Sequence, residues 1–229
     1  MLTRPARHRR LLGAAAALVA VLLSALAVVV WRDGPTRAAD FGAMSAASPA
    51  APATDRPGAP GPGPSARRAE AADDPAPAPV AAPRQLSLPR LGLRAPVDAV
   101  GVAEDGQTEV PEDPDRVGWY RFSPAPGSDE GSSVIVGHVD SKNKGLGVLN
   151  ALNEVREGDV VRVGRADGST VSYEITARRT VGKKDLAASG AFRRDGRAVL
   201  TMITCALPYV RDAGGYQNNL VVTAQEVVK

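Results

Sequence analysis

Hydrophobic and polar positions follow one another differently in two parts of the chain. Residues 11–30 form one uninterrupted apolar run, "LLGAAAALVAVLLSALAVVV", without a charge. From residue 84 onward there are short runs rich in β-branched residues, such as "SSVIVGHV", "TVSYEITARRTV", "AVLTMITC" and "NLVVTAQEVV". Gly-Asp and Asp-Gly pairs lie between several of these runs, as is typical of hairpins and loops. The pattern predicts a mainly β domain over 84–229.

One segment of this domain has helical periodicity. In "GVLNALNEVREG", the apolar residues Leu149, Leu152 and Val155 recur at intervals that place them on one face of a helix. Several strands with one or two short helices, in a domain of this length, favour a closed or nearly closed β-barrel.

The apolar run has the length of a membrane helix, because about twenty residues that rise roughly 1.5 Å each span the core of a bilayer. The arginines within 1–10 set the N-terminus in the cytoplasm and the remainder outside. A cleaved signal peptide is the alternative, but its hydrophobic stretch is usually shorter, and "RDGPTRAAD" offers only a poor cleavage site. We expect a cytoplasmic N-terminus over 1–10 and a single transmembrane helix over 11–31, with an extracellular domain.

Residues 32–83 are dominated by alanine, proline and glycine, as in "SAASPAAPATDRPGAPGPGPSARR". The segment has too little apolar surface to offset the entropy lost when a chain is ordered. It is therefore expected to be disordered. Its prolines make such a chain extended and semi-stiff. The predicted role is a spacer between the membrane and the β domain.

Composition and charge argue against several classes of function. The net charge is +3 and the arginines are scattered without interleaved aromatics, which argues against nucleic-acid binding. The sole cysteine, Cys205, cannot form an intramolecular disulfide, so the fold depends on its apolar core. One cysteine and one histidine in the domain cannot fill a zinc site, and we expect no metal and no cofactor.

Two side chains of the domain could carry chemistry. Cys205 ends the run "AVLTMITC" and His138 ends "SSVIVGH", whereas the other histidine, His8, precedes the apolar run. A thiol becomes a useful nucleophile when a neighbouring base or cation favours its thiolate. The alternatives are a small buried hydrophobe and an ordinary hydrogen-bonded histidine, and the pattern alone leaves them open.

The local sequence around both residues is similar to a known family. "LTMITC" resembles the TLxTC strand of the sortases, the transpeptidases of Gram-positive cell surfaces, and "VIVGHVD" resembles the strand and loop of the sortase histidine. The stretch from Gly118 to Asp140 resembles the actinobacterial class E/F group, and class F most. The resemblance covers about 84–229 and implies an eight-stranded, closed sortase-type β-barrel.

The resemblance also implies a reaction. Cys205 would be the nucleophile and His138 the acid/base. The Cys205 thiolate would attack the threonine carbonyl of an LPxTG-like sorting signal of a surface protein, and the His138 imidazolium would protonate the departing amine. The resulting thioester would be resolved by an amine of a peptidoglycan precursor.

The sequence departs from the family at the third catalytic residue, an arginine on or near the last strand that would stabilise the oxyanion. The chain has no arginine after Tyr216. Arg211, in the preceding loop, is one candidate for this role. An amide of Gln217 or Asn219, which would donate a weaker neutral hydrogen bond, is another. The third interpretation is a site that binds without efficient catalysis.

Substrate contacts are expected from the loop before the last strand and from the segment between "TVGKKDL" and "FRRDG". Leu207 and Pro208, with Tyr209, are candidates in the loop, although a packed loop explains them equally well. Thr204 matches the threonine of the TLxTC motif, and its ordinary interpretation is a β-branched strand residue. Asp140 could orient the imidazole, or could be a turn residue.

Two other functions were weighed against the transpeptidase. The first is an extracellular adaptor that binds sorting-signal peptides without cleaving them, which the missing late arginine motivates. The second is a wall cross-linker of the L,D-transpeptidase kind. Those enzymes resemble this chain less, because they keep histidine and cysteine together in one short motif, whereas His138 and Cys205 are far apart in the sequence.

Overall fold

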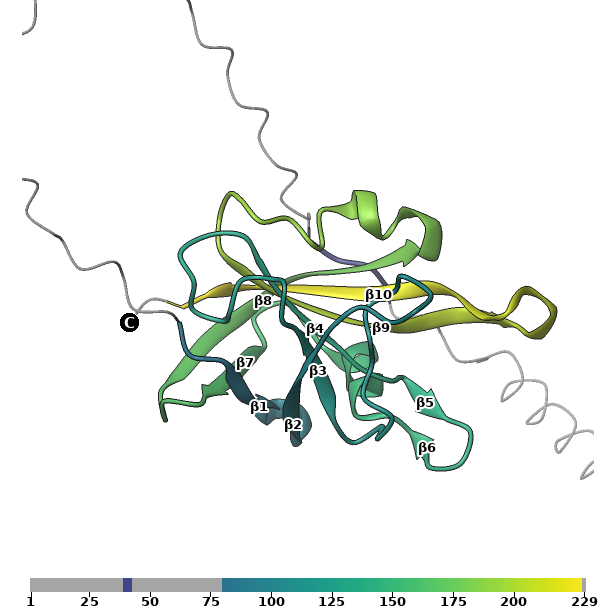
Figure 1. Ribbon diagram of the computed structural model, residues 1–229, viewed down its shortest axis with the longest axis horizontal. Helices are drawn as coiled ribbons and strands as arrows, with labels where there is room; N and C mark the ends of the chain where they lie inside the picture. The colour runs from purple at the N-terminus through teal and green to yellow at the C-terminus, as the bar shows by residue number, and fades with distance from the viewer. Residues whose placement is uncertain (1–38, 43–79, 228–229) are drawn as a thin grey trace, which may run out of the picture. The chain divides into compact units, whose positions relative to one another are not determined.

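The computed structural model describes residues 39–42 and 80–227 (Figure 1). The predicted cytoplasmic N-terminus (1–10), the predicted membrane helix (11–31) and most of the predicted linker (32–83) lie outside these residues. Within the two described ranges, no helix combines the length and the apolar character needed to cross a membrane.

Eight strands close into a barrel in the order β1-β2-β3-β4-β9-β10-β8-β7, which confirms the predicted fold. β2 pairs with β3, and β4 with β9, in parallel, and the other neighbours are antiparallel. Two short strands, β5 and β6, form a separate pair. The bounds are β1 (Pro83–Leu88), β2 (Leu93–Val100), β3 (Val117–Tyr120), β4 (Ser132–Val136), β5 (Asp140–Ser141), β6 (Gly145–Leu146), β7 (Val160–Arg165), β8 (Thr170–Gly182), β9 (Val199–Val210) and β10 (Gly215–Glu226).

The predicted helix forms as a 3₁₀ helix, η2 (Val148–Glu154). Leu149 and Leu152 are fully buried in it, and Val155 follows directly and is buried too. Because a 3₁₀ helix has three residues per turn, an interval of three residues keeps all of them on one side. Four further 3₁₀ helices are short: η1 (Pro89–Leu91), η3 (Lys183–Asp185), η4 (Ala187–Ser189) and η5 (Arg211–Ala213).

The barrel interior is filled by alternate residues of its strands. Along β8, Val171, Tyr173 and Ile175 are buried and belong to the largest core cluster. The Tyr173 hydroxyl accepts a hydrogen bond from the Gly127 amide at 2.8 Å, and burial raises the pKa of this phenol. Such a partner is needed because a buried hydroxyl without one is costly.

A short segment far upstream completes the sheet along one edge of β8. β7 pairs only with residues 170–174 of β8. Beyond them, Phe41 and Arg178 exchange two backbone hydrogen bonds, each 2.9 Å long. The Asp40 carboxylate accepts from the Thr180 amide at 2.9 Å. An uncovered edge would present unpaired backbone groups, so residues 39–42 shield part of the barrel.

Arg178 anchors this contact from the barrel side. It is 6% exposed, and its guanidinium donates to the carbonyl oxygens of Ala39, Asn153 and Val155 at 2.7–3.0 Å. The guanidinium also lies 5.1 Å from the centroid of the Phe41 ring. Four residues of the segment predicted to be a linker therefore contact the folded domain, which its Ala/Pro/Gly-rich composition did not indicate.

Candidate functional site

The parallel pairing of β4 with β9 determines where the two candidate catalytic residues lie. The register aligns Val136 with Ile203, and the Gly137 amide donates to the Ile203 carbonyl at 3.2 Å. Two positions beyond that aligned pair are His138 and Cys205. Since neighbouring strands are about 4.8 Å apart, the fold brings these two distant residues to the same end of adjacent chains.

Cys205 opens onto a cavity. Its thiol is half-buried and lines a space of about 470 Å³. Burial raises the pKa of the Cys205 thiol, the positive charge of Lys183 lowers it, and the negative charge of Asp140 raises it. The other residues of the wall are Gly106, Gln107, Thr108, Val110, Val136, Gly137, Lys183, Lys184, Leu186, Ala187, Phe192, Ile203, Thr204 and Asn219.

His138 is half-buried and held by one ring nitrogen. Its Nε2 lies 2.9 Å from the Pro111 carbonyl oxygen. A carbonyl oxygen only accepts, so Nε2 carries the proton, and Nδ1 is the acceptor in the neutral ring. Gly147 lies against the backbone here, because a Cβ at that position would be 2.3 Å from the His138 carbonyl oxygen. Glycine is therefore required where η2 begins.

Thr204 stabilises the site through its side chain. It is 2% exposed, and its hydroxyl donates to the Gly137 carbonyl at 2.9 Å. This bond links the residue before Cys205 to the residue before His138. The sequence placed Thr204 among the substrate contacts, and the structure gives its hydroxyl a partner within the protein.

On the other side of Cys205, β10 presents a row of amides. Asn219 pairs directly with Cys205, is 8% exposed and lines the cavity. The Gln217 amide instead donates to the Gly215 carbonyl at 2.6 Å, and the Asn218 amide donates to the Leu207 carbonyl at 2.6 Å. Of the two amides that the sequence proposed, the structure brings Asn219, and not Gln217, to Cys205.

Arg211 lies elsewhere. It begins η5 at the tip of the β9–β10 hairpin, where the side chain is exposed. It follows Cys205 by six residues, and at about 3.3 Å per residue the strand carries it roughly 20 Å along the hairpin. The structure therefore does not bring Arg211 together with Cys205. None of the described residues that line the cavity is an arginine.

The outer part of β9 holds the other candidate substrate contacts. Leu207 is 46% and Tyr209 51% exposed, and the bond from Leu207 to Pro208 is cis. These residues, with Pro208, lie outside the wall of the Cys205 cavity. The Tyr209 and Tyr216 rings meet edge-on, with centroids 5.1 Å apart.

Asp140 joins β5 to β10. Its carboxylate accepts a hydrogen bond from the Tyr216 hydroxyl at 2.5 Å. Burial, and then this carboxylate, raise the pKa of Tyr216 to about 12. The hydrogen bond recorded for Asp140 is therefore to a tyrosine rather than to His138.

Residues of the segment between "TVGKKDL" and "FRRDG" line the Cys205 cavity, and they include cations that the sequence analysis had not singled out. Val181, Asn219 and Cys205 lie side by side on β8, β10 and β9. Lys183 follows Val181 by two residues, and both it and Lys184 line the cavity. The sequence feature that could have indicated these cations is a lysine pair directly after a long β-rich run.

No group of three or more histidine, cysteine or acidic side chains able to hold a metal ion occurs in residues 39–42 and 80–227. The chemistry that the site can offer from its own side chains is that of a thiol, an imidazole, an amide and two ammonium groups. This set suits nucleophilic acyl transfer.

A closed barrel whose sole thiol opens onto a cavity, with a histidine just past the end of the adjacent strand β4, has the parts of a cysteine transpeptidase. The family model described as Sortase domain matches residues 86–227, and the chain belongs to the sortase family. Sortases are cysteine transpeptidases, and the family supports that activity for this chain.

One solved structure supports the fold, and a second is reported beside it. Sortase C-1 from Actinomyces oris is 24% identical, with a TM-score of 0.50 over 63% of this chain and 73% of that one. Sortase C1 from Streptococcus agalactiae is 23% identical, with a TM-score of 0.49 over 63% of this chain and 67% of that one. Among curated proteins, none matches this chain.

Proposed function

We propose that this protein is a membrane-anchored sortase, most similar to class F of the actinobacterial class E/F group, which cleaves an LPxTG-like sorting signal after its threonine and transfers the acyl part to a cell-wall amine. The single observation that carries the proposal is the placement of Cys205 on the wall of a cavity. Cys205 follows the aligned pair of Val136 and Ile203 by two positions, as does His138, which lies just past the end of β4.

The first half-reaction forms a thioester. His138 takes the proton of the Cys205 thiol, and its Nδ1 is available because Nε2 donates to the Pro111 carbonyl. The sulfur attacks the threonine carbonyl carbon, and the electron pair of the C–N bond leaves with the glycine amine. The His138 imidazolium returns its proton to that amine.

The second half-reaction transfers the acyl group. An amine of a peptidoglycan precursor attacks the thioester carbonyl, the C–S bond breaks, and the sulfur leaves as a thiolate. His138 accepts the proton that the attacking amine loses. The thiolate is then protonated, and the enzyme returns to its starting state.

Asn219 takes the place of the missing arginine as the oxyanion donor in this account. It pairs with Cys205 across β9 and β10, and its side chain is largely buried, which limits the orientations open to its amide. A neutral donor is weaker than a guanidinium. Lys183, on the same cavity wall, supplies the positive charge that an amide lacks.

The N-terminal residues 11–31 would hold the enzyme in the cell membrane with the barrel on the extracellular side, where surface proteins and wall precursors meet. This part of the proposal is supported by the uncharged apolar run and the arginines before it. Because residues 39–42 pair with β8, residues 32–38 would connect the predicted membrane helix to the barrel.

The test uses the full chain in detergent micelles with a Leu-Pro-Ala-Thr-Gly peptide and hydroxylamine as the amine. We expect a threonine hydroxamate and a released glycine peptide with the wild type, and neither with Cys205→Ala. A hydroxamate that still forms with Cys205→Ala, or no product with any Leu-Pro-X-Thr-Gly peptide, would overturn the proposal.

A second candidate is an adaptor that binds sorting signals without cleaving them. Two observations favour it: burial raises the pKa of the Cys205 thiol, and no arginine is found among the described residues of the cavity wall. An adaptor would bind the peptide and leave Cys205 free of acyl groups, whereas the transferase would form a thioester with the same peptide.

A further inference from the structure

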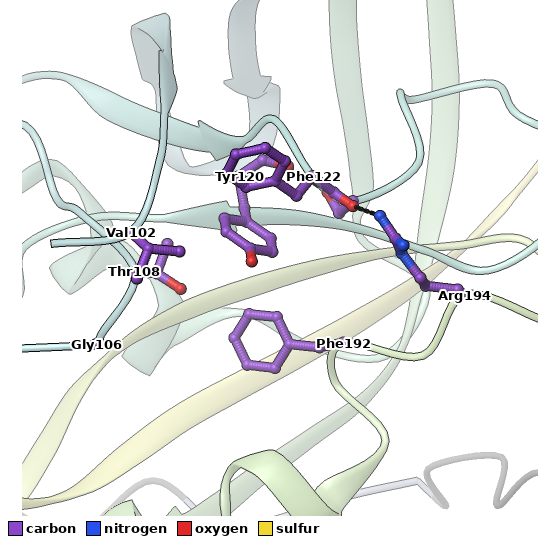
Figure 2. A pocket seen from close by; sticks show the side chains of 8 residues that line it. Val102, Gly106, Thr108, Tyr120, Phe122, Phe192 and Arg194 are labelled. Atoms are coloured by element: carbon purple, nitrogen blue, oxygen red, sulfur yellow. Dashed lines mark hydrogen bonds between the residues drawn. The ribbon is translucent and has the colours of Figure 1, made fainter.

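A second cavity lies beside the first and is walled largely by aromatic rings (Figure 2). Its volume is about 510 Å³. It shares Gly106, Thr108 and Phe192 with the wall of the Cys205 cavity, so the two spaces adjoin. The remaining wall residues are Val102, Tyr120, Phe122, Ser123 and Arg194.

The rings form a stable cluster. Tyr120 meets Phe122 edge-on at a centroid distance of 5.5 Å and Phe192 at 5.8 Å. Phe122 and Val102 are nevertheless 47% exposed each. Figure 2 shows the Tyr120 ring between the Phe122 and Phe192 rings. Exposed apolar side chains gathered in a hollow are typical of a binding site.

Two of the polar side chains around the rings, Ser123 and Arg194, have hydrogen-bond partners within the protein. The Arg194 guanidinium donates to the Phe122 carbonyl, which ties the loop before β9 to the loop after β3. The Ser123 hydroxyl donates to the Tyr120 carbonyl at 2.7 Å and accepts from the Val134 amide at 3.1 Å. This cavity therefore offers a ligand apolar and aromatic surface, together with the hydroxyls of Tyr120 and Thr108.

We propose that the aromatic cavity binds an apolar or aromatic side chain of the peptide substrate, upstream of the sorting motif. The inference rests on the proposed function and names a substrate contact outside the motif. The shared wall allows one extended peptide to occupy both cavities.

The choice of the upstream part follows from the reaction. The acyl part of the substrate stays on the enzyme through both half-reactions, whereas the downstream part must leave before the amine can approach the thioester. A binding surface that stays occupied through both half-reactions is therefore expected to bind the acyl part of the substrate. An added apolar contact there strengthens binding of substrate and transition state alike, so it lowers KM more than it raises kcat.

The experiment measures binding without cleavage, in the full-length Cys205→Ala protein in detergent. Fluorescent peptides carry Leu-Pro-Ala-Thr-Gly with a phenylalanine placed at each of several positions upstream, and in a second set downstream of glycine, in an otherwise Gly/Ser sequence. We expect one or two of the upstream positions to strengthen binding about tenfold over the peptide without phenylalanine, which is typical of burying one apolar side chain.

Phe122→Ala in the same protein should abolish that preference, and Phe192→Leu should weaken it. Leu146→Ala is the matched control, because Leu146 is 69% exposed and outside both cavities. Far-ultraviolet circular dichroism confirms that each variant is folded. Equal binding of all peptides, a preference that survives Phe122→Ala, or a phenylalanine favoured only downstream of glycine would overturn the inference.

These outcomes are separate from those of the proposed function. If the wild type forms no hydroxamate but the preference depends on Phe122, the transferase proposal fails and the cavity remains a peptide site. If hydroxamate forms and no upstream residue matters, the reaction stands and the cavity proposal fails.

Discussion

The inner and outer halves of the β9–β10 hairpin differ in what surrounds them. In the inner half, every residue of β9 from Val199 to Thr204 is buried, with β4 on one side and β10 on the other. In the outer half, residues 207–210 are exposed, and the hairpin extends beyond the barrel (Figure 1). Cys205 is the first residue of β9 that is not buried.

This boundary explains how one chain can hold a nucleophile firmly and still expose it. The buried half fixes the position of β9 through the core and through the Thr204 hydroxyl, which donates to the Gly137 carbonyl. The outer half pairs with its own partner strand only, so it contributes little to the position of Cys205. A thiol deeper in the strand would be inaccessible, and one further out would be less well positioned.

The largest contrast is between substitutions on the two sides of the boundary. Cys205→Ala should abolish peptide transfer and change the free energy of unfolding by less than about 1.5 kcal/mol, since the site is only half-buried. Leu200→Ala should destabilise the domain by about 2–5 kcal/mol, because its side chain is fully buried. Urea unfolding and a transfer assay of both variants measure the contrast, and it is lost if Cys205→Ala unfolds as easily as Leu200→Ala.

Removal of the imidazole should be the next largest effect. His138→Ala is expected to lower kcat/KM by about 10²–10⁴, the usual contribution of a general acid/base. Binding of a Leu-Pro-Ala-Thr-Gly peptide should change little, because the ring is held at Nε2 by the Pro111 carbonyl and acts at Nδ1. Steady-state kinetics with a fluorogenic peptide give the result, and an unchanged rate would remove His138 from the mechanism.

Two of the three positions proposed for the missing arginine, Asn219 and Arg211, lie in different halves of the hairpin. Asn219→Ala should lower kcat by about 10²–10³ if its amide stabilises the oxyanion. Arg211→Ala, at the exposed tip, should leave kcat within about twofold of the wild type, as surface substitutions usually do. Both are measured under saturating peptide. The reverse ranking would mean that the hairpin tip folds back over Cys205 when substrate binds.

The effect of nearby charges on the pKa of the Cys205 thiol can be measured without a substrate. Burial raises the pKa of Cys205 and the charge of Lys183 opposes this, so alkylation by iodoacetamide should rise with pH with a midpoint above that of a free thiol, about 8.5. Lys183→Ala removes a charge that favours the thiolate, and should move the midpoint upward. Lys184→Ala serves as the control. A midpoint that Lys183→Ala lowers, or leaves unchanged, contradicts the role assigned to this lysine.

Much of the site could be predicted from the sequence because both candidates lie where a buried apolar run ends, although the prediction that Cys205 ends its strand was wrong, since β9 continues to Val210. The runs "SSVIVGH" and "AVLTMITC" stop at His138 and Cys205, and the barrel then places β4 beside β9. The choice among Arg211, Gln217 and Asn219 could not be predicted in this way. It depends on the hairpin register, which shifts between Tyr216 and Asn218 and which no local pattern encodes.

Two further features depend on tertiary contacts alone. Residues 39–42 pair with β8 because β8 continues past the end of β7. How far each strand extends beyond its neighbour is set by the closure of the barrel and not by the local sequence. The aromatic cavity is assembled from the loop after β2, the end of β3 and the loop before β9. Each of these contributes one or two apolar residues that alone would pass as ordinary surface or core positions.

The central claim is that Cys205 carries the acyl group, and intact-protein mass spectrometry tests it most directly. The full chain is mixed with a Leu-Pro-Ala-Thr-Gly peptide, quenched in acid within seconds and then digested. The account predicts a mass increase equal to the acyl part of the peptide, located on the fragment with Cys205 and removed by hydroxylamine. An adduct on any other residue, or none at saturating peptide, contradicts it.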